Sequence, residues 1–381
     1  MKIVHIADSH LGLAAFNKLD VDGMNLRERL MYDNFINAIE IIIAQRPDAI
    51  IHAGDLFDQV RPKTRSFVVV LEALERLKSA GIPLLIIAGN HSMTKTRYTT
   101  SPFSVLEYHG AEIHAAYHHK YRRVEVGGTV FHLIPGMLNV LDYRRAFDEI
   151  ERATHSYNVM VTHGLATTLH DRRLKTVAEH EIDSTMLSDT FDYIALGHYH
   201  GQQQVGERAW YCGSTEFLDY GEIGDTKGGL IVDLGARTVT HLTLPCTPMI
   251  DGGVIDCREE SPRKVQDALV TALEQPSFPH QSMIQVTLTH LARQKGKEID
   301  YRVLNPARER FLDIHIRIQS ADEEYPAPLA GDLQEIDYLD EFSGFVKRKG
   351  FTAAEEGFVL TQGKALIDEI IHQRGSDESA P

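Results

Sequence analysis

The first half of the chain alternates short apolar runs with longer amphipathic stretches. The short runs have the length and composition of strands buried on both faces. Residues 26–44 and 66–80 carry apolar positions at helical spacing, and Gly81 ends the second stretch. Strands alternating with helices predict a layered α/β domain with parallel strands. The short runs are residues 3–7, 49–53, 84–88, 158–162 and 193–196.

Beyond residue 208 the pattern changes to short apolar runs without long helices, which predicts the last strands of the first domain. Prolines and glycines over 245–253 then indicate a boundary, and a smaller β-α-β-α-β pattern follows. We therefore predict an α/β domain over residues 1–244, a capping domain over 245–318, an acidic linker over 319–331, a helical segment over 332–374 and a disordered tail over 375–381.

Polar residues follow five of the predicted strands at the point where each strand ends. In α/β sheets, ligand sites form at the carboxyl ends of the strands, so these side chains are expected to converge. Glycine beside several of them allows the sharp turn that convergence requires. The segments are Asp8-Ser9-His10, Gly54-Asp55-Leu56-Phe57-Asp58, Gly89-Asn90-His91, His163-Gly164 and Gly197-His198-Tyr199-His200.

The chemistry of these side chains indicates a metal centre. Carboxylate, amide oxygen and imidazole, without a thiolate, suit Mn²⁺, Fe or Zn²⁺ better than Cu(I) or Ca²⁺. Seven ligands are too many for one catalytic ion but suit two ions that share a carboxylate. Two such ions can clamp the attacking and leaving oxygens of a phosphoryl displacement. Each motif alone is weak, whereas all five in order favour a dinuclear phosphoesterase centre.

Composition and charge add limits on location and partners. The chain is 43% hydrophobic and 24% charged, as globular proteins are, and no apolar run approaches the ~18 residues of a membrane span. Its start lacks the layout of a signal peptide, so a cytoplasmic protein without a membrane partner is expected. Residues 319–381 hold 5 basic and 14 acidic residues and account for −9 of the net charge of −15. The nearly balanced remainder is compatible with a nucleic-acid partner.

The five segments, in this order, resemble the calcineurin-like metallophosphoesterase superfamily. The resemblance implies a four-layer α/β/β/α sandwich. His91 would face the phosphate and stabilise or protonate the leaving oxygen, and Asp58 would orient a ligand. The implied ligands are Asp8, His10 and His200 for the first metal, Asn90, His163 and His198 for the second, and Asp55 as the bridge between them.

Within this superfamily, the layout resembles the nuclease subunits of DNA double-strand-break repair complexes, called SbcD in bacteria and the meiotic recombination eleven nuclease in archaea and eukaryotes. The resemblance rests on A-D-S-H-L-G, G-D-L-F-D, Y-C-G-S-T-E-F and K-G-G-L-I-V-D-L, followed by the small α/β unit and helical segment. It implies two Mn²⁺ per subunit, exonuclease and single-strand endonuclease action at DNA ends, a homodimer, and an SbcC-type coiled-coil ABC ATPase as partner. One departure is Ser92, where the family usually has an acid that could orient His91; a serine can still form a hydrogen bond, so activity is expected.

Two further groups of residues suggest contacts with DNA and with a second subunit. The apolar helix over residues 68–77, with Leu74 on its outward face, and a helix over 101–108 would form the dimer contact. Basic residues in the loops after the motifs would bind the DNA backbone, unless they are ordinary surface. They are Arg61, Lys63, Lys95, Arg97, Arg172 and Arg173.

Two alternatives to a DNA nuclease remain at this point. A small-molecule or nucleotide phosphodiesterase could use the same dinuclear site. A scaffold protein whose metal site has decayed would not need the complete ligand set that this sequence retains. Assays with duplex DNA and with bis-p-nitrophenyl phosphate in the presence of Mn²⁺ separate the first alternative from the nuclease.

Overall fold

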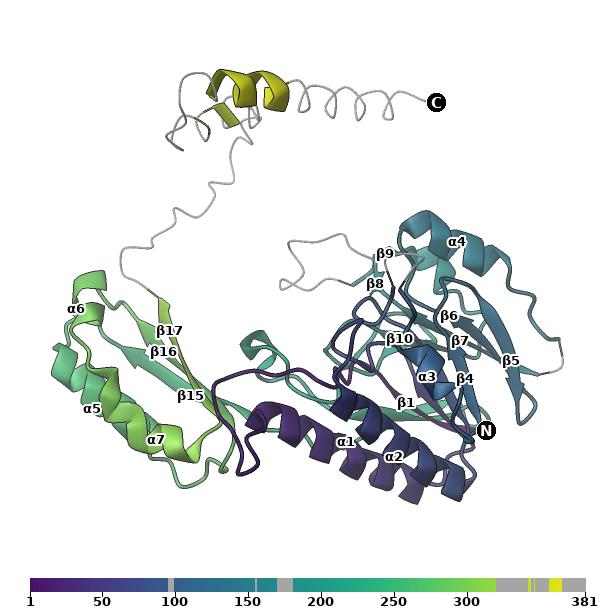
Figure 1. Cartoon of the computed structure of the whole chain (residues 1–381), viewed down its shortest axis with the longest axis horizontal. Coiled ribbons are helices and arrows are strands. Elements are labelled where there is room, and N and C mark those ends of the chain that lie inside the picture. The colour runs from purple at the N-terminus through teal and green to yellow at the C-terminus, as the bar shows by residue number, and fades with distance from the viewer. Residues whose placement is uncertain are drawn as a thin grey trace. The chain divides into compact units, whose positions relative to one another are not determined.

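A computed structural model describes most of the chain, in two compact units that comprise Met1–Asp322 and Glu323–Pro381 (Figure 1). In the second unit, residues 356–364 are helical, within the predicted helical segment. The predicted tail over 375–381 lies outside the described residues. So does the predicted linker over 319–331, except for Gln319. Among the described helices, none has the length and apolar content to cross a membrane. The described residues are 1–94, 99–154, 156–169, 181–319, 342–343, 346 and 356–364.

The first of two large sheets has six strands in the order β14-β13-β1-β2-β3-β4. Strands β1 to β4 run parallel, and β13 and β14 join antiparallel at one side. Helices α1 (Leu26–Ala44) and α2 (Thr64–Ala80) provide the crossovers β1-α1-β2 and β2-α2-β3. The strands are β1 (Lys2–Ile6), β2 (Ala49–His52), β3 (Leu84–Ile87), β4 (Ile113–Ala116), β13 (Gly229–Asp233) and β14 (Thr238–Leu242).

The second sheet also has six strands, in the order β11-β12-β10-β7-β6-β5. Its four central strands are parallel, and the two edge strands β5 and β11 are antiparallel to their neighbours. Helix α4 (Val140–Asp148) packs near β6 and β9. The strands are β5 (Arg122–Val126), β6 (Thr129–Ile134), β7 (Tyr157–His163), β10 (Tyr193–Gly197), β11 (Gln203–Gln204) and β12 (Ala209–Tyr211).

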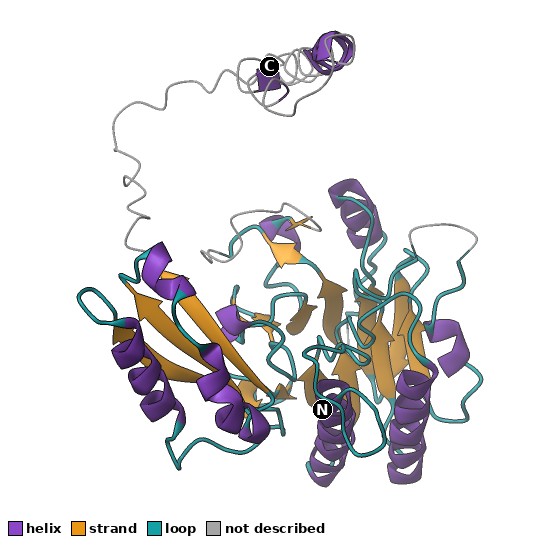
Figure 2. Cartoon of the chain, turned by 60° about the vertical axis from the view of Figure 1, so that its left-hand side comes forward, coloured by secondary structure: helices purple, strands orange, loops and turns teal. Residues whose placement is uncertain are grey.

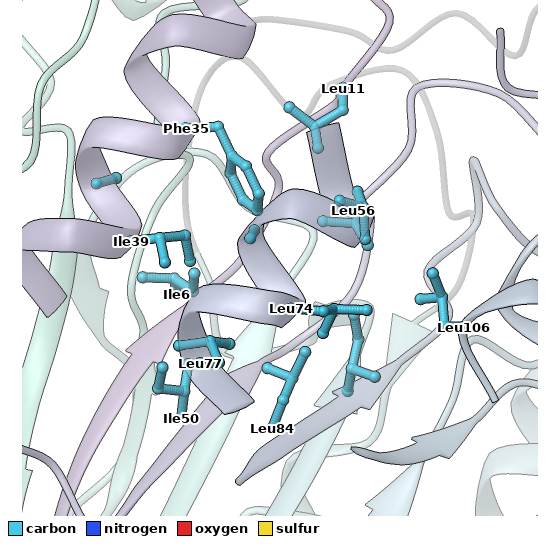
Figure 3. Packing of buried hydrophobic residues seen from close by; sticks show 14 of the residues in the cluster. Ile6, Leu11, Phe35, Ile39, Ile50, Leu56, Leu74, Leu77, Leu84 and Leu106 are labelled. Atoms are coloured by element: carbon cyan, nitrogen blue, oxygen red, sulfur yellow. The ribbon is translucent and has the colours of Figure 1, made fainter. Parts of the chain in front are cut away.

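Alternation along the strands produces four layers, as β1 illustrates. Ile6 packs in a cluster with residues of α1 and α2, which cover the outer face of the first sheet (Figure 3). Ile3 instead packs between the two sheets, against Phe131 of β6. The outer face of the second sheet forms a third cluster, to which α4 contributes Tyr143. The predicted four-layer α/β/β/α sandwich is therefore confirmed.

Residues 249–319 form a third, smaller sheet with its own buried cluster. Its strands β15 (Met249–Asp256), β16 (Met283–Thr289) and β17 (Asp313–Gln319) are all parallel (Figure 2). Helix α5 (Pro262–Leu273) begins with Ser261, whose side chain accepts from the N–H of Lys264. The predicted boundaries of the capping domain stay a prediction. The short elements are α3 (Phe103–Leu106), β8 (Leu165–Ala166), β9 (Glu181–Ile182), η2 (Ser184–Met186), η3 (Tyr220–Glu222), α6 (Arg293–Lys297), η4 (Tyr301–Leu304) and α7 (Asn305–Arg310).

The expected position of Leu74 on an outward helix face is wrong. Its side chain is 1% exposed and lies in the core between α2 and the first sheet, in the cluster that includes Leu84 and Leu106 (Figure 3). Val68, one of the other apolar residues of α2, is 47% exposed. The broad apolar arc of α2 contains both a core-facing and an outward side, and Leu74 belongs to the first.

Candidate metal centre

The residues that follow the parallel strands meet at the carboxyl ends of both sheets. His163, at the end of β7, places Nε2 3.1 Å from Oδ2 of Asp55, which follows β2. The Asn90 Oδ1 atom lies 2.9 Å from this Nε2 and 3.0 Å from Nδ1 of His198. The main-chain N–H of His198 donates to the Asp8 carboxylate at 3.0 Å. Strands of two different sheets thus contribute to one cluster.

Three overlapping groups of side chains could each hold a metal ion. In each group, one ligand atom per residue lies within 4.8 Å of the others. Asp8 and Asp55 each occur in two of the groups, so the carboxylates are positioned to be shared between ions. The groups are Asp8 with His10 and His200, His10 with Asp55 and His91, and Asp8 with Asp55 and His163.

Hydrogen bonds at Nδ1 leave the Nε2 atoms of two histidines to face this cluster. His163 Nδ1 donates to the carbonyl of Ala53 at 2.8 Å, and His10 Nδ1 lies 3.3 Å from a carboxylate oxygen of Asp58. Such partners fix the tautomer of a histidine that binds a metal through its other nitrogen. Nε2 of His10 is buried without a hydrogen-bond partner in the described structure. A cation at this position would satisfy it, so the donor set fits a divalent metal.

His200 is held in the same manner by residues that the sequence pattern did not reveal. Its Nδ1 lies 2.7 Å from Oε1 of Glu222, and Oε2 of Glu222 accepts from the buried ammonium of Lys227 at 2.7 Å. Burial alone would raise the pKa of Glu222, but His200 and Lys227 lower it to about 2. Glu222 lies 22 residues beyond His200 in a segment without metal-ligand spacing, so no sequence signal singled it out.

The two central carboxylates are buried and respond differently to their surroundings. Burial raises the pKa of Asp8, because a charged carboxylate loses its hydration there. Burial would do the same for Asp55, but the imidazoles of His163 and His10 outweigh it and lower the pKa of Asp55. The two carboxylates in turn raise the pKa of His163 to about 9, against the effect of its burial. A cation bound here would offset the charge of the same two buried carboxylates.

The backbone at four of these residues has the left-handed conformation that glycine favours. The φ angles are 51° at Asp8, 43° at His10, 49° at Asp55 and 94° at His198. For residues with a side chain this conformation costs on the order of 1 kcal/mol or more each, and such strain concentrates at functional sites. The unusual turns aim side chains from successive strands into one volume.

The glycines beside the ligands leave room for the ligands themselves. A Cβ atom added at Gly54 or Gly197 would overlap the His163 ring or the Ala53 carbonyl, and one at Gly89 would overlap the Asp55 carboxylate. These three glycines are therefore required by close packing against the candidate ligands and the neighbouring strand.

We expect Gly89→Ala to displace Asp55 and to weaken metal binding and hydrolysis by about 10–100-fold, the usual cost of disturbing a ligand's support. Isothermal titration with Mn²⁺ and hydrolysis of bis-p-nitrophenyl phosphate would measure both. Gly296→Ala is the matched control, because a Cβ atom at that helical position meets Leu291 only at ordinary contact distance. Unchanged Mn²⁺ affinity in Gly89→Ala would contradict the placement of Asp55.

His91 lies beside the cluster and is oriented by a main-chain carbonyl. Its Nδ1 donates to the main-chain carbonyl of Asp58 at 3.0 Å, and its ring meets that of His10 edge-on with centroids 4.6 Å apart. The buried hydroxyl of Ser92 has no hydrogen-bond partner in the described structure, so Ser92 does not orient the His91 ring there. Orientation of His91 therefore comes from Asp58.

The basic residues proposed to bind DNA fall into two sets. Arg61 is exposed, and the ammonium of Lys63 pairs with the carboxylate of Glu28 at 2.6 Å, so part of its charge is already compensated. The rest lie outside the described residues: Lys95, Arg97, Arg172 and Arg173.

Comparison with known proteins identifies the family. Residues 1–202, more than half of the chain, match the calcineurin-like phosphoesterase family. The chain belongs to this family. The recognition made from the strand-end motifs is thus confirmed, and the chain is a metal-dependent phosphoesterase.

Two relatives from archaea resemble this calcineurin-like phosphoesterase along much of its length. The protein named DNA double-strand break repair protein Mre11 of Methanocaldococcus jannaschii is 28% identical over 97% of this chain and 95% of its own length. The Mre11 protein of Methanococcus maripaludis is 26% identical over 65% of this chain and 68% of its own. A solved structure of a dimetal phosphatase from Danio rerio covers 60% of this chain and 91% of that chain, with 10% identity and a TM-score of 0.35.

Proposed function

We propose that this calcineurin-like phosphoesterase is a Mn²⁺-dependent DNA nuclease that processes double-strand-break ends. The observation that carries the chemical part is the convergence of the buried side chains of Asp8, Asp55 and His163, with His163 Nε2 3.1 Å from Asp55 Oδ2. The choice of DNA as substrate is supported by the relatives named Mre11, one of which aligns with 97% of the chain.

In this proposal the seven strand-end residues bind two ions. Asp8, His10 and His200 would hold the first, Asn90, His163 and His198 the second, and Asp55 both. Divalent ions here would offset the charge of a phosphodiester and assist its attack by water. Mn²⁺ is proposed because the set contains carboxylate, amide and imidazole groups without a thiolate.

His91 and Asp58 have supporting roles in this proposal. The ring of His91 is exposed at the edge of the cluster, and its Nδ1–H is already used by the carbonyl of Asp58. The remaining nitrogen, Nε2, can therefore meet a phosphate or the leaving oxygen and can donate to it when the ring is protonated. Asp58 acts through its two neighbours: its carboxylate holds His10, and its carbonyl holds His91.

The decisive experiment compares two substrates. With Mn²⁺ the purified chain should degrade end-labelled duplex DNA, cleave single-stranded DNA, and hydrolyse bis-p-nitrophenyl phosphate; chelation should abolish all three reactions. Hydrolysis of the small ester without any cleavage of DNA would instead show a small-molecule phosphodiesterase. Absence of both activities in a protein that binds Mn²⁺ would contradict catalysis by this site.

The proposed partners are a second copy of the chain and an SbcC-type ABC ATPase in the cytoplasm. The helical segment over 332–374, proposed to bind the ATPase, is described only in part; its Val346 is buried, and Phe358 is 68% exposed. For the dimer, each of the two proposed helices carries an exposed apolar residue: Val68 of α2 is 47% exposed and Val105 of α3 is 42% exposed, and Tyr108, just beyond α3, is 92% exposed.

We expect Val68→Asp to convert a wild-type dimer into monomers that still bind Mn²⁺. A charge in a buried apolar contact is costly, so association should weaken by at least about tenfold. Sedimentation velocity would measure this, and the monomers should hydrolyse bis-p-nitrophenyl phosphate normally but process duplex ends poorly. Ile41→Asp, on the neighbouring helix α1 at 37% exposure, is the control. A wild type that sediments as a monomer would refute the dimer.

A further inference from the structure

Glu222 and Lys227 attach His200 to the protein at two points. The Glu222 carboxylate holds the His200 ring through Nδ1 at 2.7 Å. The Lys227 ammonium donates to the other oxygen of Glu222 at 2.7 Å, to the main-chain carbonyl of His200 at 3.0 Å and to the Ser214 hydroxyl at 2.9 Å. All three ammonium protons are thereby used, and both Glu222 and Lys227 are buried. The ring and the backbone of His200 therefore depend on one buried ion pair.

The same short segment contacts the sheet formed by residues 249–319. Glu222 is the last residue of η3, and Tyr220 is its first. The Tyr220 hydroxyl donates to the Asp313 carboxylate at 2.7 Å, and its ring stacks on that of His315 with centroids 4.7 Å apart. Asp313 and His315 both belong to β17.

Apolar packing strengthens this second contact. A buried cluster lies at one end of the third sheet. It consists of Met249 of β15, Met283 of β16 and Leu312, the residue before β17. Three residues pack against this cluster: Phe217 before η3, Tyr220 within it and Ile223 directly after it. A short segment fixed by both an apolar cluster and a hydrogen bond will follow the third sheet if that sheet shifts.

We propose that the segment 217–227 is a mechanical link through which the third sheet, formed by residues 249–319, sets the position of His200. Glu222 and Lys227 are the positioning residues at the His200 end of this link, and Tyr220 is the contact residue at the other end. This inference rests on the proposed function, because it assumes that His200 binds a metal ion. A substrate that contacts the unit 249–319 would then alter one metal ligand without touching it.

The test measures Mn²⁺ binding to metal-free protein by isothermal titration, independently of catalysis. Wild type should bind two ions. Glu222→Ala should weaken one binding step by about 10–100-fold and leave the other nearly unchanged, because Glu222 supports only His200. Glu222→Gln, which retains an acceptor for Nδ1, should fall between Ala and wild type. Glu207→Gln is the control: it removes a carboxylate charge that pairs with Arg208 at 3.4 Å, outside the segment 217–227.

Tyr220→Phe tests the far end of the link, because it removes the hydrogen bond to Asp313 and keeps the ring. It should weaken the same Mn²⁺ step by a smaller factor, about 2–10-fold. Asp313→Ala, which removes the acceptor, should have a similar effect that does not add to the first. The unfolding temperature of metal-free protein shows whether each variant is folded; if Glu222→Ala is not, Glu222→Gln decides.

Three outcomes would overturn particular parts. Wild-type affinity in both Glu222 variants would refute the positioning of His200. Wild-type affinity in Tyr220→Phe, together with loss in Glu222→Gln, would refute the link to β17. A wild-type protein that binds no Mn²⁺ would refute the proposed function itself, which separates that failure from failure of the link.

Discussion

Replacing His91 by alanine should leave both Mn²⁺ ions bound and reduce the rate constant for hydrolysis by about 10²–10⁴-fold, the usual contribution of a positioned acid or hydrogen-bond donor. The ring is exposed at the edge of the site and is held by the Asp58 carbonyl rather than by the buried carboxylates. The contact that His91 makes with Asp55 is through its main-chain N–H at 2.9 Å, which alanine retains. The substitution therefore removes only the ring.

Single-turnover hydrolysis and Mn²⁺ titration on the same preparation would measure this effect. His290→Ala, at an exposed histidine paired with Asp256 outside the cluster, is the control and should behave as wild type. The geometry also permits the opposite result, since His91 groups with His10 and Asp55 as a candidate ligand set. Loss of an ion in His91→Ala would assign His91 as a metal ligand and not as the residue facing the leaving oxygen.

Replacing Asp55 by alanine should have a larger effect, on the order of 10⁴-fold or more in rate, through loss of the metal centre. The carboxylate is 1% exposed, lies 3.1 Å from His163 Nε2 and accepts from the main-chain N–H of His91. It belongs to two of the three candidate ligand groups, so its removal should disturb both ions. The nearby imidazoles lower its pKa, which keeps it ionised and able to bind cations near neutral pH.

Inductively coupled plasma analysis after dialysis against Mn²⁺ would give the number of bound ions. Asp55→Asn, nearly the same in size and still able to accept the His91 N–H, separates the charge from the shape. Asp55→Asn should bind as few ions as Asp55→Ala. Its unfolding temperature in the absence of metal should equal that of wild type. Two tightly bound ions in Asp55→Ala would show that another residue bridges them.

The seven candidate ligands could be predicted from the sequence because each lies at the end of a buried strand or within a few residues of it. Strand ends are visible as the change from an apolar run to glycine and polar residues, and parallel strands bring such ends together. Residues 26–44 were predicted as a helix with the bounds that α1 has in the structure. These predictions depend on local patterns, which the sequence contains directly.

The remainder depends on contacts between distant segments. No element was predicted for β5, β6 or α4, although the Gly127-Gly128 turn between the first two is a hairpin signal. The core position of Leu74 could not be read from periodicity, because α2 is apolar over more than one face. The support of His200 by Glu222 joins residues from a strand end and a later loop, and no spacing rule connects them.

The left-handed backbone at Asp8, His10, Asp55 and His198 has a consequence for protein engineering. Glycine would relieve the steric cost at each position, so a selection for heat resistance in metal-free conditions favours replacing the very side chains that form the centre. Ligands bound only by the native state add stability in proportion to the logarithm of their concentration, which reverses that preference when metal is abundant. Screens for robust variants should therefore be run with saturating metal, because under those conditions resistance to heat and retention of the catalytic centre are selected together.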